Sequence, residues 1–210
     1  MLAKICQHYG LGSVVAIDPH NFNNAELQEQ RTEPDSSTFQ EFQENLRQAG
    51  VSEMVDVRRA YSHDVAAQWR DPIRFLWIDG DHSWAGAKAD FADFFPYLLP
   101  DSIVALHDAL HEFAGPIRVF VEEMLRSDKF GASGFVHSIA WSQFRPEDGA
   151  QYAPQRASIE RYASRLIPFL RNEEALRGLN KICFKLHRAR VPRQALSPDT
   201  LAAQLNSGIA

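Results

Sequence analysis

The chain has 210 residues, of which 45% are hydrophobic and 23% are charged, and its formal net charge is −5. This length is typical of one globular domain, and 14 Phe, 4 Trp and 5 Tyr exclude a disordered chain because they can supply a sizeable core. The acidic balance argues against a general nucleic-acid binder, and no apolar run approaches the roughly 18 residues of a membrane helix, so we expect neither partner. Two cysteines, in no metal or redox motif, favour a cytoplasmic location.

Helices and strands alternate in the first third of the chain. Gly10 is placed to end a helix in the left-handed conformation, and Asp18-Pro19 stops an apolar run. The predicted order is a helix at 2–9, a strand at 14–17, a polar loop at 20–37, a helix at 38–50, a strand at 54–57 and a short helix at 65–69.

The same alternation continues through the rest of the chain. Ser83 is placed to cap a helix, and Gly115-Pro116 to start another. The predicted elements are strands at 73–78, 103–106, 135–141 and 181–186, and helices at 84–98, 116–125 and 159–169. Residues 192–210 are small and polar, so we expect a domain at 1–191 followed by a flexible tail.

Short apolar strands separated by amphipathic helices define the fold class. They predict an α/β fold with a doubly wound, Rossmann-like, mostly parallel sheet that carries helices on both faces. In such folds ligands bind at the carboxyl ends of the strands. The residues that follow each strand are therefore the candidates for chemistry.

Polar residues follow four of the predicted strands. They are Asp18, Tyr61-Ser62, Asp79-Gly80-Asp81-His82 and His107-Asp108. Asp, Ser and Gly are also ordinary stop signals after strands. Acid and imidazole on neighbouring strand ends suit a divalent metal ion, and a hydrogen-bonded network without an ion is the alternative.

Charge is distributed unevenly along the chain. From Arg156 to Arg193 there are ten Lys or Arg and only three Glu. This stretch is either a solvated helix face or a basic surface for an anionic substrate or partner.

Four segments together carry a family resemblance: Val15-Ala16-Ile17-Asp18, Phe42 to Val51, Trp77-Ile78-Asp79-Gly80-Asp81-His82-Ser83-Trp84 and Ala105-Leu106-His107-Asp108. In their order and spacing, over about residues 2–186, the chain resembles class I S-adenosylmethionine-dependent methyltransferases. It is most similar to the branch with Ile-Asp-Gly-Asp-His-Ser-aromatic after the fourth strand and His-Asp after the fifth.

The resemblance implies a set of cofactor-binding residues. Asp18 would accept hydrogen bonds from the ribose hydroxyls of S-adenosylmethionine, since one carboxylate can serve both. Tyr61 and Ser62 would lie near the adenine, and His82 and Trp84 would flank it.

The resemblance also implies the reaction centre. Asp79 would be the catalytic or metal-binding carboxylate and a cofactor contact, and His107 and Asp108 would be further metal ligands. The implied reaction is methyl transfer from the sulfonium to an oxygen of a small molecule or sugar, with Mg²⁺ or another divalent cation as an optional helper. Without a metal, Asp79 or His107 would be the general base.

One departure from the family pattern concerns the N-terminus. The family has a first strand and a Gly-rich loop before the helix that is predicted here at 2–9. We therefore expect a shortened form of a longer protein, with Met1 internal. The alternatives are a short form that pairs differently or forms homo-oligomers, an inactive relic or interaction domain, and an α/β enzyme with a hydrolytic metal centre.

Overall fold

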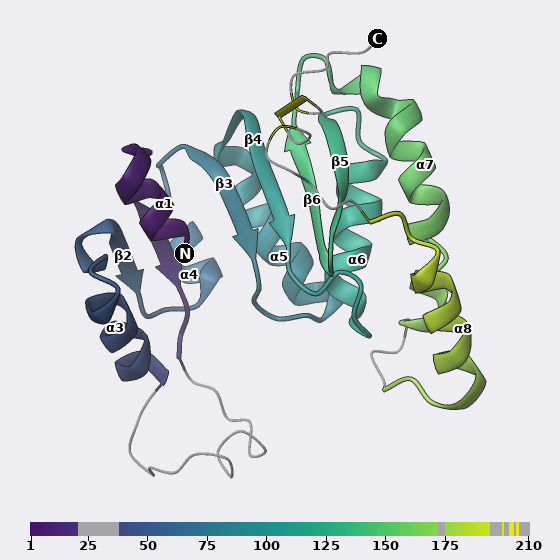
Figure 1. Ribbon diagram of the computed structural model, residues 1–210, viewed down its shortest axis with the longest axis horizontal. Coiled ribbons are helices and arrows are strands. Elements are labelled where there is room, and N and C mark those ends of the chain that lie inside the picture. Colours follow the sequence, from purple (N-terminus) through teal and green to yellow (C-terminus); the bar gives the residue numbers. More distant parts are fainter. Residues whose placement is uncertain (21–37, 172–174, 194–198, 200–201, 204, 206–210) are drawn as a thin grey trace. The chain divides into compact units, whose positions relative to one another are not determined.

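The computed structural model describes residues 1–20, 38–171, 175–193, 199, 202, 203 and 205. These residues form two compact units, Met1–Trp69 and Arg70–Ala210, and each unit is described by itself (Figure 1). The predicted loop at 20–37 lies outside the described residues except for His20, and so does most of the predicted tail at 192–210.

The first unit is built around two parallel strands. Helix α1 (Leu2–Tyr9) ends at Gly10, which has φ 64°, the left-handed cap that the sequence predicts. Strand β1 (Val14–Ile17) pairs with β2 (Val55–Arg58) from Val14 opposite Val55 to Ile17 opposite Arg58. The other elements are α3 (Thr38–Gln48), a 3-10 turn (Ser52–Met54) and α4 (Ser62–Ala66), which starts three residues before the predicted short helix.

The second unit contains a four-stranded sheet in the order β3-β4-β6-β5. Strands β3 and β4 are parallel, whereas β6 is antiparallel to both β4 and β5. Its elements are β3 (Ile73–Ile78), α5 (Trp84–Phe94), a 3-10 turn (Phe95–Tyr97), β4 (Leu98–Leu106), α6 (Ala114–Val119), a π-helical turn (Phe120–Leu125), β5 (Phe130–Val136), β6 (Ile139–Phe144), a 3-10 turn (Gly149–Tyr152), α7 (Ala153–Ala163), a 3-10 turn (Ile167–Phe169) and α8 (Gly178–Ala189). Alternating strands and helices with parallel pairs confirm the predicted Rossmann-like α/β class.

The helices predicted at 84–98 and 159–169 are each a shorter α-helix followed by a 3-10 turn. Two other predicted elements of the second unit differ in kind from the structure. The single strand predicted at 135–141 is an antiparallel hairpin, β5 and β6, which turns at His137 with φ 52°. The last strand predicted at 181–186 is wrong, because these residues lie within helix α8. Their alternating apolar positions also fit a helical period when Leu179 is included, and Phe184 is buried on the helix's inner side.

The core of the second unit holds β3 and β4 in place. Helices α5 and α6 lie against one face of its sheet (Figure 1). Leu106, Ile117, Phe120, Met124 and Phe135 have no solvent exposure, and the rings of Phe120 and Phe135 meet edge to face with centroids 4.9 Å apart. Burying a large apolar side chain stabilises a fold by roughly 1.5–3 kcal/mol, so this core fixes the ends of β3 and β4 firmly.

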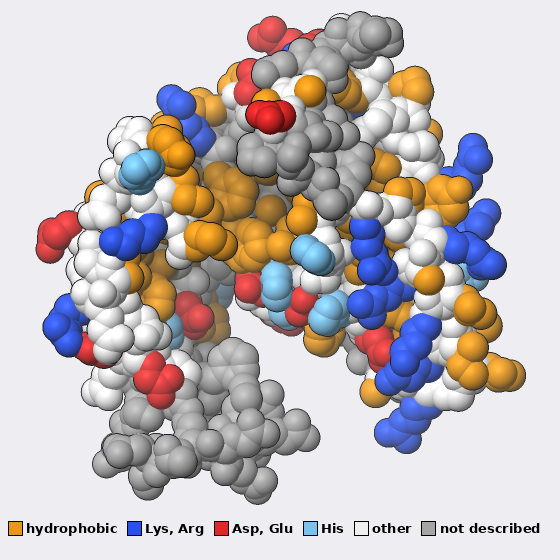
Figure 2. All heavy atoms as spheres, viewed as in Figure 1, with side chains coloured by type: hydrophobic (Ala, Val, Ile, Leu, Met, Phe, Trp, Pro, Cys, Tyr) orange, Lys and Arg blue, Asp and Glu red, His pale blue; other side chains and the backbone are white. Residues whose placement is uncertain are grey.

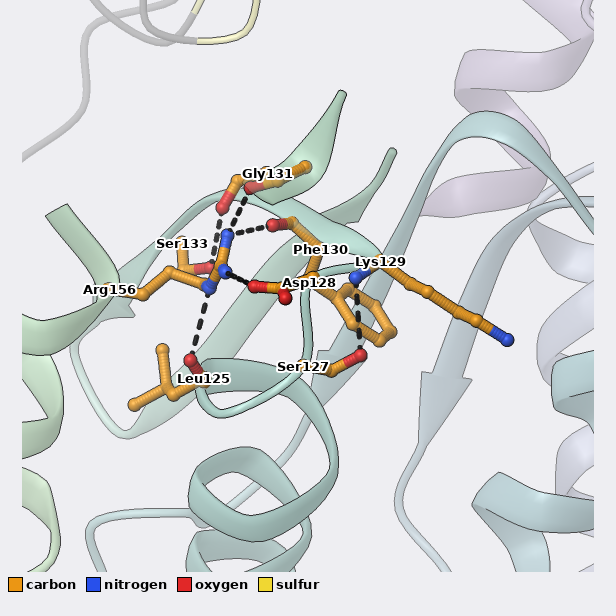
Figure 3. A network of polar contacts seen from close by, with 9 residues as sticks. Leu125, Ser127, Asp128, Lys129, Phe130, Gly131, Ser133 and Arg156 are labelled. Atoms are coloured by element: carbon orange, nitrogen blue, oxygen red, sulfur yellow. Dashed lines mark hydrogen bonds and ion pairs between the residues drawn. The ribbon is translucent and has the colours of Figure 1, made fainter. Parts of the chain in front are cut away.

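A buried arginine ties three segments of this unit together (Figure 3). Arg156 on α7 is only 1% exposed, and its guanidinium donates to the carbonyl of Leu125 at 3.0 Å and to those of Phe130 and Gly149. Asp128 lies 3.4 Å away. Burial lowers the pKa of the guanidinium, and Asp128 opposes that shift. The side chain therefore satisfies backbone carbonyls at the end of the π-helical turn, at the start of β5 and in the 3-10 turn at Gly149–Tyr152.

Candidate functional site

The ends of β3 and β4 bring two of the predicted polar segments side by side. Ile78 lies opposite Leu106 in the parallel register, and the backbone N–H of His107 donates to the carbonyl of Ile78 at 3.0 Å. Asp79 and His107 are therefore neighbours, each at the first position after its strand. Figure 2 shows histidine and acidic side chains gathered below the ends of these two strands.

Asp79, His82 and His107 form the centre of this cluster. The Nδ1 atom of His107 lies 2.9 Å from Oδ1 of Asp79, and Nε2 of His82 lies 3.7 Å from the same oxygen. Each of the three side chains offers one potential ligand atom, and these atoms lie within 4.8 Å of one another. Two ligands of one transition-metal ion, each about 2 Å from it, lie roughly 3–4 Å apart. A small inward movement would let the three atoms share one ion.

Asp108 and His111 extend the cluster on the β4 side. The carboxylate of Asp108 lies 3.4 Å from Nδ1 of His107, 3.9 Å from Nε2 of His82 and 3.7 Å from Nε2 of His111. Asp108 itself has φ 53°, a left-handed conformation that Asp tolerates better than most residues. The cluster thus contains two carboxylates and three imidazoles.

Two imidazole nitrogens of the cluster lack hydrogen bonds. Nε2 of His82 and Nδ1 of His107 are buried, and neither makes a hydrogen bond with any described residue; the contact of His107 with Asp79 is close but not aligned as one. A buried polar atom without a partner is costly, so it is usually satisfied by something bound. These two nitrogens fit a metal ion or a polar group of a ligand.

The residues of the Asp-Gly-Asp-His-Ser segment have two roles: some form the turn before α5 and others contribute to the cluster. Asp81 accepts from the backbone N–H of Ser83 with one carboxylate oxygen and from its hydroxyl with the other, both at 2.8 Å. The Ser83 hydroxyl in turn accepts from the backbone N–H of Gly86 at 3.1 Å, which confirms the predicted cap of α5. Asp81 and Ser83 therefore shape the turn, while Asp79 and His82 face the cluster.

Helix α6 holds the His82 backbone from the other side. The backbone N–H of Gly115 donates to the carbonyl of His82 at 2.9 Å. A Cβ atom at position 115 would lie 2.2 Å from the carbonyl oxygen of Ser83 and 2.6 Å from that of His82. The ring of Phe113 lies beside the imidazole of His82, with centroids 4.6 Å apart. The close approach that positions His82 thus requires glycine at 115.

Trp84 does not lie in the cluster. It is the first residue of α5, and its ring faces the guanidinium of Arg118 at 3.9 Å and the ammonium of Lys88 at 5.0 Å. The sequence placed Asp79 and His82 in one strand-end segment, and the structure brings these two side chains close together. The adenine contact that the resemblance implies for His82 and Trp84 stays a prediction.

The other predicted site residues follow the strands of the first unit. Asp18 comes directly after β1, is exposed, and accepts from the backbone N–H of His20 at 2.6 Å. Tyr61 precedes α4, is 51% exposed and stacks on the ring of His63. Ser62 is the first residue of α4. Because β1 and β2 are parallel, these residues belong to the same edge of that strand pair.

Comparison with protein families identifies the class. Residues 1–109, more than half of the chain, match the family described as "Methyltransferase domain". The chain therefore belongs to this family and is a class I S-adenosylmethionine-dependent methyltransferase, as the resemblance indicated. No curated protein matches the chain.

Solved structures with a similar fold are distant in sequence. A candidate O-methyltransferase from Klebsiella pneumoniae is 13% identical, with 68% of this chain and 79% of that chain covered and a TM-score of 0.46. The O-methyltransferase from Bacillus cereus in complex with SAH is 16% identical, with coverage of 68% and 78% and a TM-score of 0.44. MycE methyltransferase from the mycinamycin biosynthetic pathway, in complex with Mg, SAH and mycinamycin VI, is 12% identical, with coverage of 70% and 50% and a TM-score of 0.43.

Proposed function

We propose that this methyltransferase transfers the methyl group to an oxygen of a small-molecule or sugar acceptor, with a divalent metal bound by the cluster at the ends of β3 and β4. The observation that carries the proposal is the pair of buried, unpartnered imidazole nitrogens of His82 and His107 beside the Asp79 carboxylate. Asp79, His107 and Asp108 are the proposed metal ligands, and we add His82 to them.

The donor types of this cluster narrow the choice of metal. Mg²⁺ prefers six oxygen ligands, whereas imidazole nitrogen suits Zn²⁺, Cu²⁺, Ni²⁺ or iron better. Two carboxylates and two imidazoles fit this second group. When bound, such an ion lowers the pKa of a coordinated acceptor hydroxyl and orients its oxygen toward the methyl group.

The protein's own residues supply positioning and proton acceptance. If no metal binds, the Asp79 carboxylate and the His107 imidazole are the proposed general bases for the acceptor hydroxyl. Both side chains are partly exposed at the strand ends, where an acceptor can reach them. His82, held by Gly115 and Phe113, keeps a fixed place beside them. The methyl donor carries a good leaving group, so correct placement of the acceptor oxygen supplies most of the catalysis.

The proposed cofactor contacts outside the cluster are predictions from the family pattern. Asp18 would accept from the ribose hydroxyls, and its carboxylate is exposed, with one oxygen accepting from the backbone N–H of His20. Tyr61 and Ser62 are proposed to lie near the adenine, and Trp84 is proposed as a further adenine contact.

Calorimetry tests the metal and the cofactor separately. Metal-stripped protein is titrated with Mg²⁺, Mn²⁺ and Zn²⁺, and then with S-adenosylmethionine. Asp79→Asn should weaken metal binding by at least about tenfold. Asp93→Asn is the matched control, because it removes a carboxylate from α5 outside the cluster. Metal binding that is equal in both variants would refute the assignment of the site.

A transfer assay tests the reaction. A panel of small hydroxylated acceptors, catechols and sugars among them, is incubated with methyl-labelled cofactor and the preferred metal. We expect labelled product from the wild type and from Asp93→Asn, and little from Asp79→Asn. Metal binding without any cofactor binding would instead favour a hydrolytic metal centre.

A further inference from the structure

Helix α8 presents its apolar stripe to solvent rather than to the core. Leu179 is 78% exposed, and Ile182 and Leu186 are each 55% exposed. Their spacing of three and four residues places them on one face of the helix. Only Phe184 is fully buried, on the side that packs toward the rest of the unit. A surface helix normally turns its apolar stripe inward, so this outward stripe calls for a binding partner.

Basic side chains accompany this stripe. Residues 175–193 contain six Lys or Arg and no Asp or Glu. Lys181 forms an ion pair with Glu112 at 3.3 Å. Within the described part of the chain, Lys185, Arg188 and Arg190 form no ion pair with a carboxylate. Figure 2 shows Lys and Arg side chains beside hydrophobic ones over α8. The surface therefore combines apolar area with positive charge that forms few ion pairs with the described carboxylates.

The charge indicates which partner fits. A second copy docked through α8 would bring two positively charged helices together, and like charges at an interface are unfavourable. An anionic surface compensates the charge instead. We propose that α8 docks on an anionic lipid surface, with Leu179, Ile182 and Leu186 in the headgroup layer and the exposed Lys185 and Arg190, on either side of this stripe, beside the phosphates.

This mode of binding differs from membrane insertion. The sequence-based expectation of no membrane partner depended on the lack of a run long enough to span a bilayer. Among the described helices, indeed, none combines the length and apolar character needed to cross one. A helix that lies in the interface has no such length requirement, and α8, with 12 residues, is about 18 Å long. The proposal is independent of the acceptor and of the metal proposed above.

Vesicle co-sedimentation tests the proposal with the full chain. The probes are phosphatidylcholine vesicles and vesicles that contain 30% phosphatidylglycerol. We expect binding to the anionic vesicles that weakens at least tenfold between low and high salt, and little binding to the neutral ones. The double variant Ile182→Glu/Leu186→Glu should lose at least tenfold in anionic-vesicle binding. Asn180→Glu, a single new charge on the same helix away from the stripe, should lose far less.

A fluorescent reporter distinguishes insertion from simple charge attraction. Cys183 is exposed on α8, and Cys6→Ser leaves it as the one thiol of the chain. An environment-sensitive label at Cys183 should shift to the blue on anionic vesicles and be quenched by lipid-borne quenchers. Absence of wild-type binding at low salt would overturn the proposal. A second result would also overturn it: light scattering shows that the wild type is a dimer, the double variant is a monomer, and neither protein binds vesicles.

Circular dichroism and cofactor calorimetry check that the variants are folded. The side chains substituted on α8 are exposed and lie outside the proposed site, so both readings should match the wild type. Wild-type vesicle binding by the folded double variant would show that the stripe is not the docking surface.

Discussion

The replacement of Arg156 by methionine is expected to destabilise the second unit strongly. Methionine keeps most of the apolar stem but removes the guanidinium that donates to the carbonyls of Leu125, Phe130 and Gly149. These acceptors belong to the backbone, so no side-chain substitution can remove them together with the donor. The variant therefore leaves buried carbonyls without their arginine partner.

The magnitude follows from two opposing contributions. Three hydrogen bonds to a charged donor contribute roughly 1.5–3 kcal/mol each, about 5–9 kcal/mol in sum. Burying the guanidinium, which is 1% exposed, costs several kcal/mol that the variant recovers. The expected net loss is about 3 kcal/mol. For a protein of this size each kcal/mol shifts Tm by about 2–4 °C, so Tm should fall by about 6–12 °C.

Thermal and urea unfolding followed by circular dichroism provide the assay. Arg126→Met is the matched control, because Arg126 pairs with Glu160 at 2.6 Å but is 52% exposed, and such a pair contributes at most about 1 kcal/mol. Arg156→Lys should fall between wild type and Arg156→Met, since one ammonium cannot reach all three carbonyls. A Tm of Arg156→Met within about 2 °C of the control would refute this reasoning, because such a difference corresponds to less than about 1 kcal/mol.

Two further outcomes follow from contacts near the strand ends and in the segment that follows β6. Gly115→Ala should displace the His82 backbone, because its Cβ would overlap the carbonyls of the 82–83 turn, so metal affinity should fall even where the variant stays folded; calorimetry on folded protein measures this. Asp148 has a pKa lowered by its hydrogen bond with Arg145, so its contribution to stability is present above the ordinary Asp pKa of about 3.9 and is lost as pH falls through the lower folded value. Asp148→Asn should accordingly flatten the fall in Tm at acidic pH, and an unchanged pH profile would contradict the role of this pair.

Local pattern was sufficient for the strand ends. The stop signals Asp18, Asp79 and His107 mark where β1, β3 and β4 end, because a polar residue that interrupts an apolar run leaves the sheet. The parallel class then required these ends to share an edge within each strand pair. Asp79 and His107 could therefore be predicted as neighbours from the sequence.

The fate of residues 181–186 could not be predicted in the same way. Their apolar positions fit both a two-residue and a helical period, and the burial of Phe184 against the rest of its unit decides between them. The hairpin at 130–144 could not be predicted either, because the turn at His137 contains no Gly or Pro to mark it in the sequence.

What the sequence determined by itself is therefore the alternation of elements, the family and the types of residue at the strand ends, all of which are encoded within a few neighbouring positions. Only the tertiary structure decided which nitrogens of His82 and His107 lie near the Asp79 carboxylate, and to which carbonyls the Arg156 guanidinium donates. The first depends on strand register and on the approach of Gly115, and the second on packing between residues 7 to 31 positions apart. Such contacts are set by the packing of the whole unit, which no local pattern specifies.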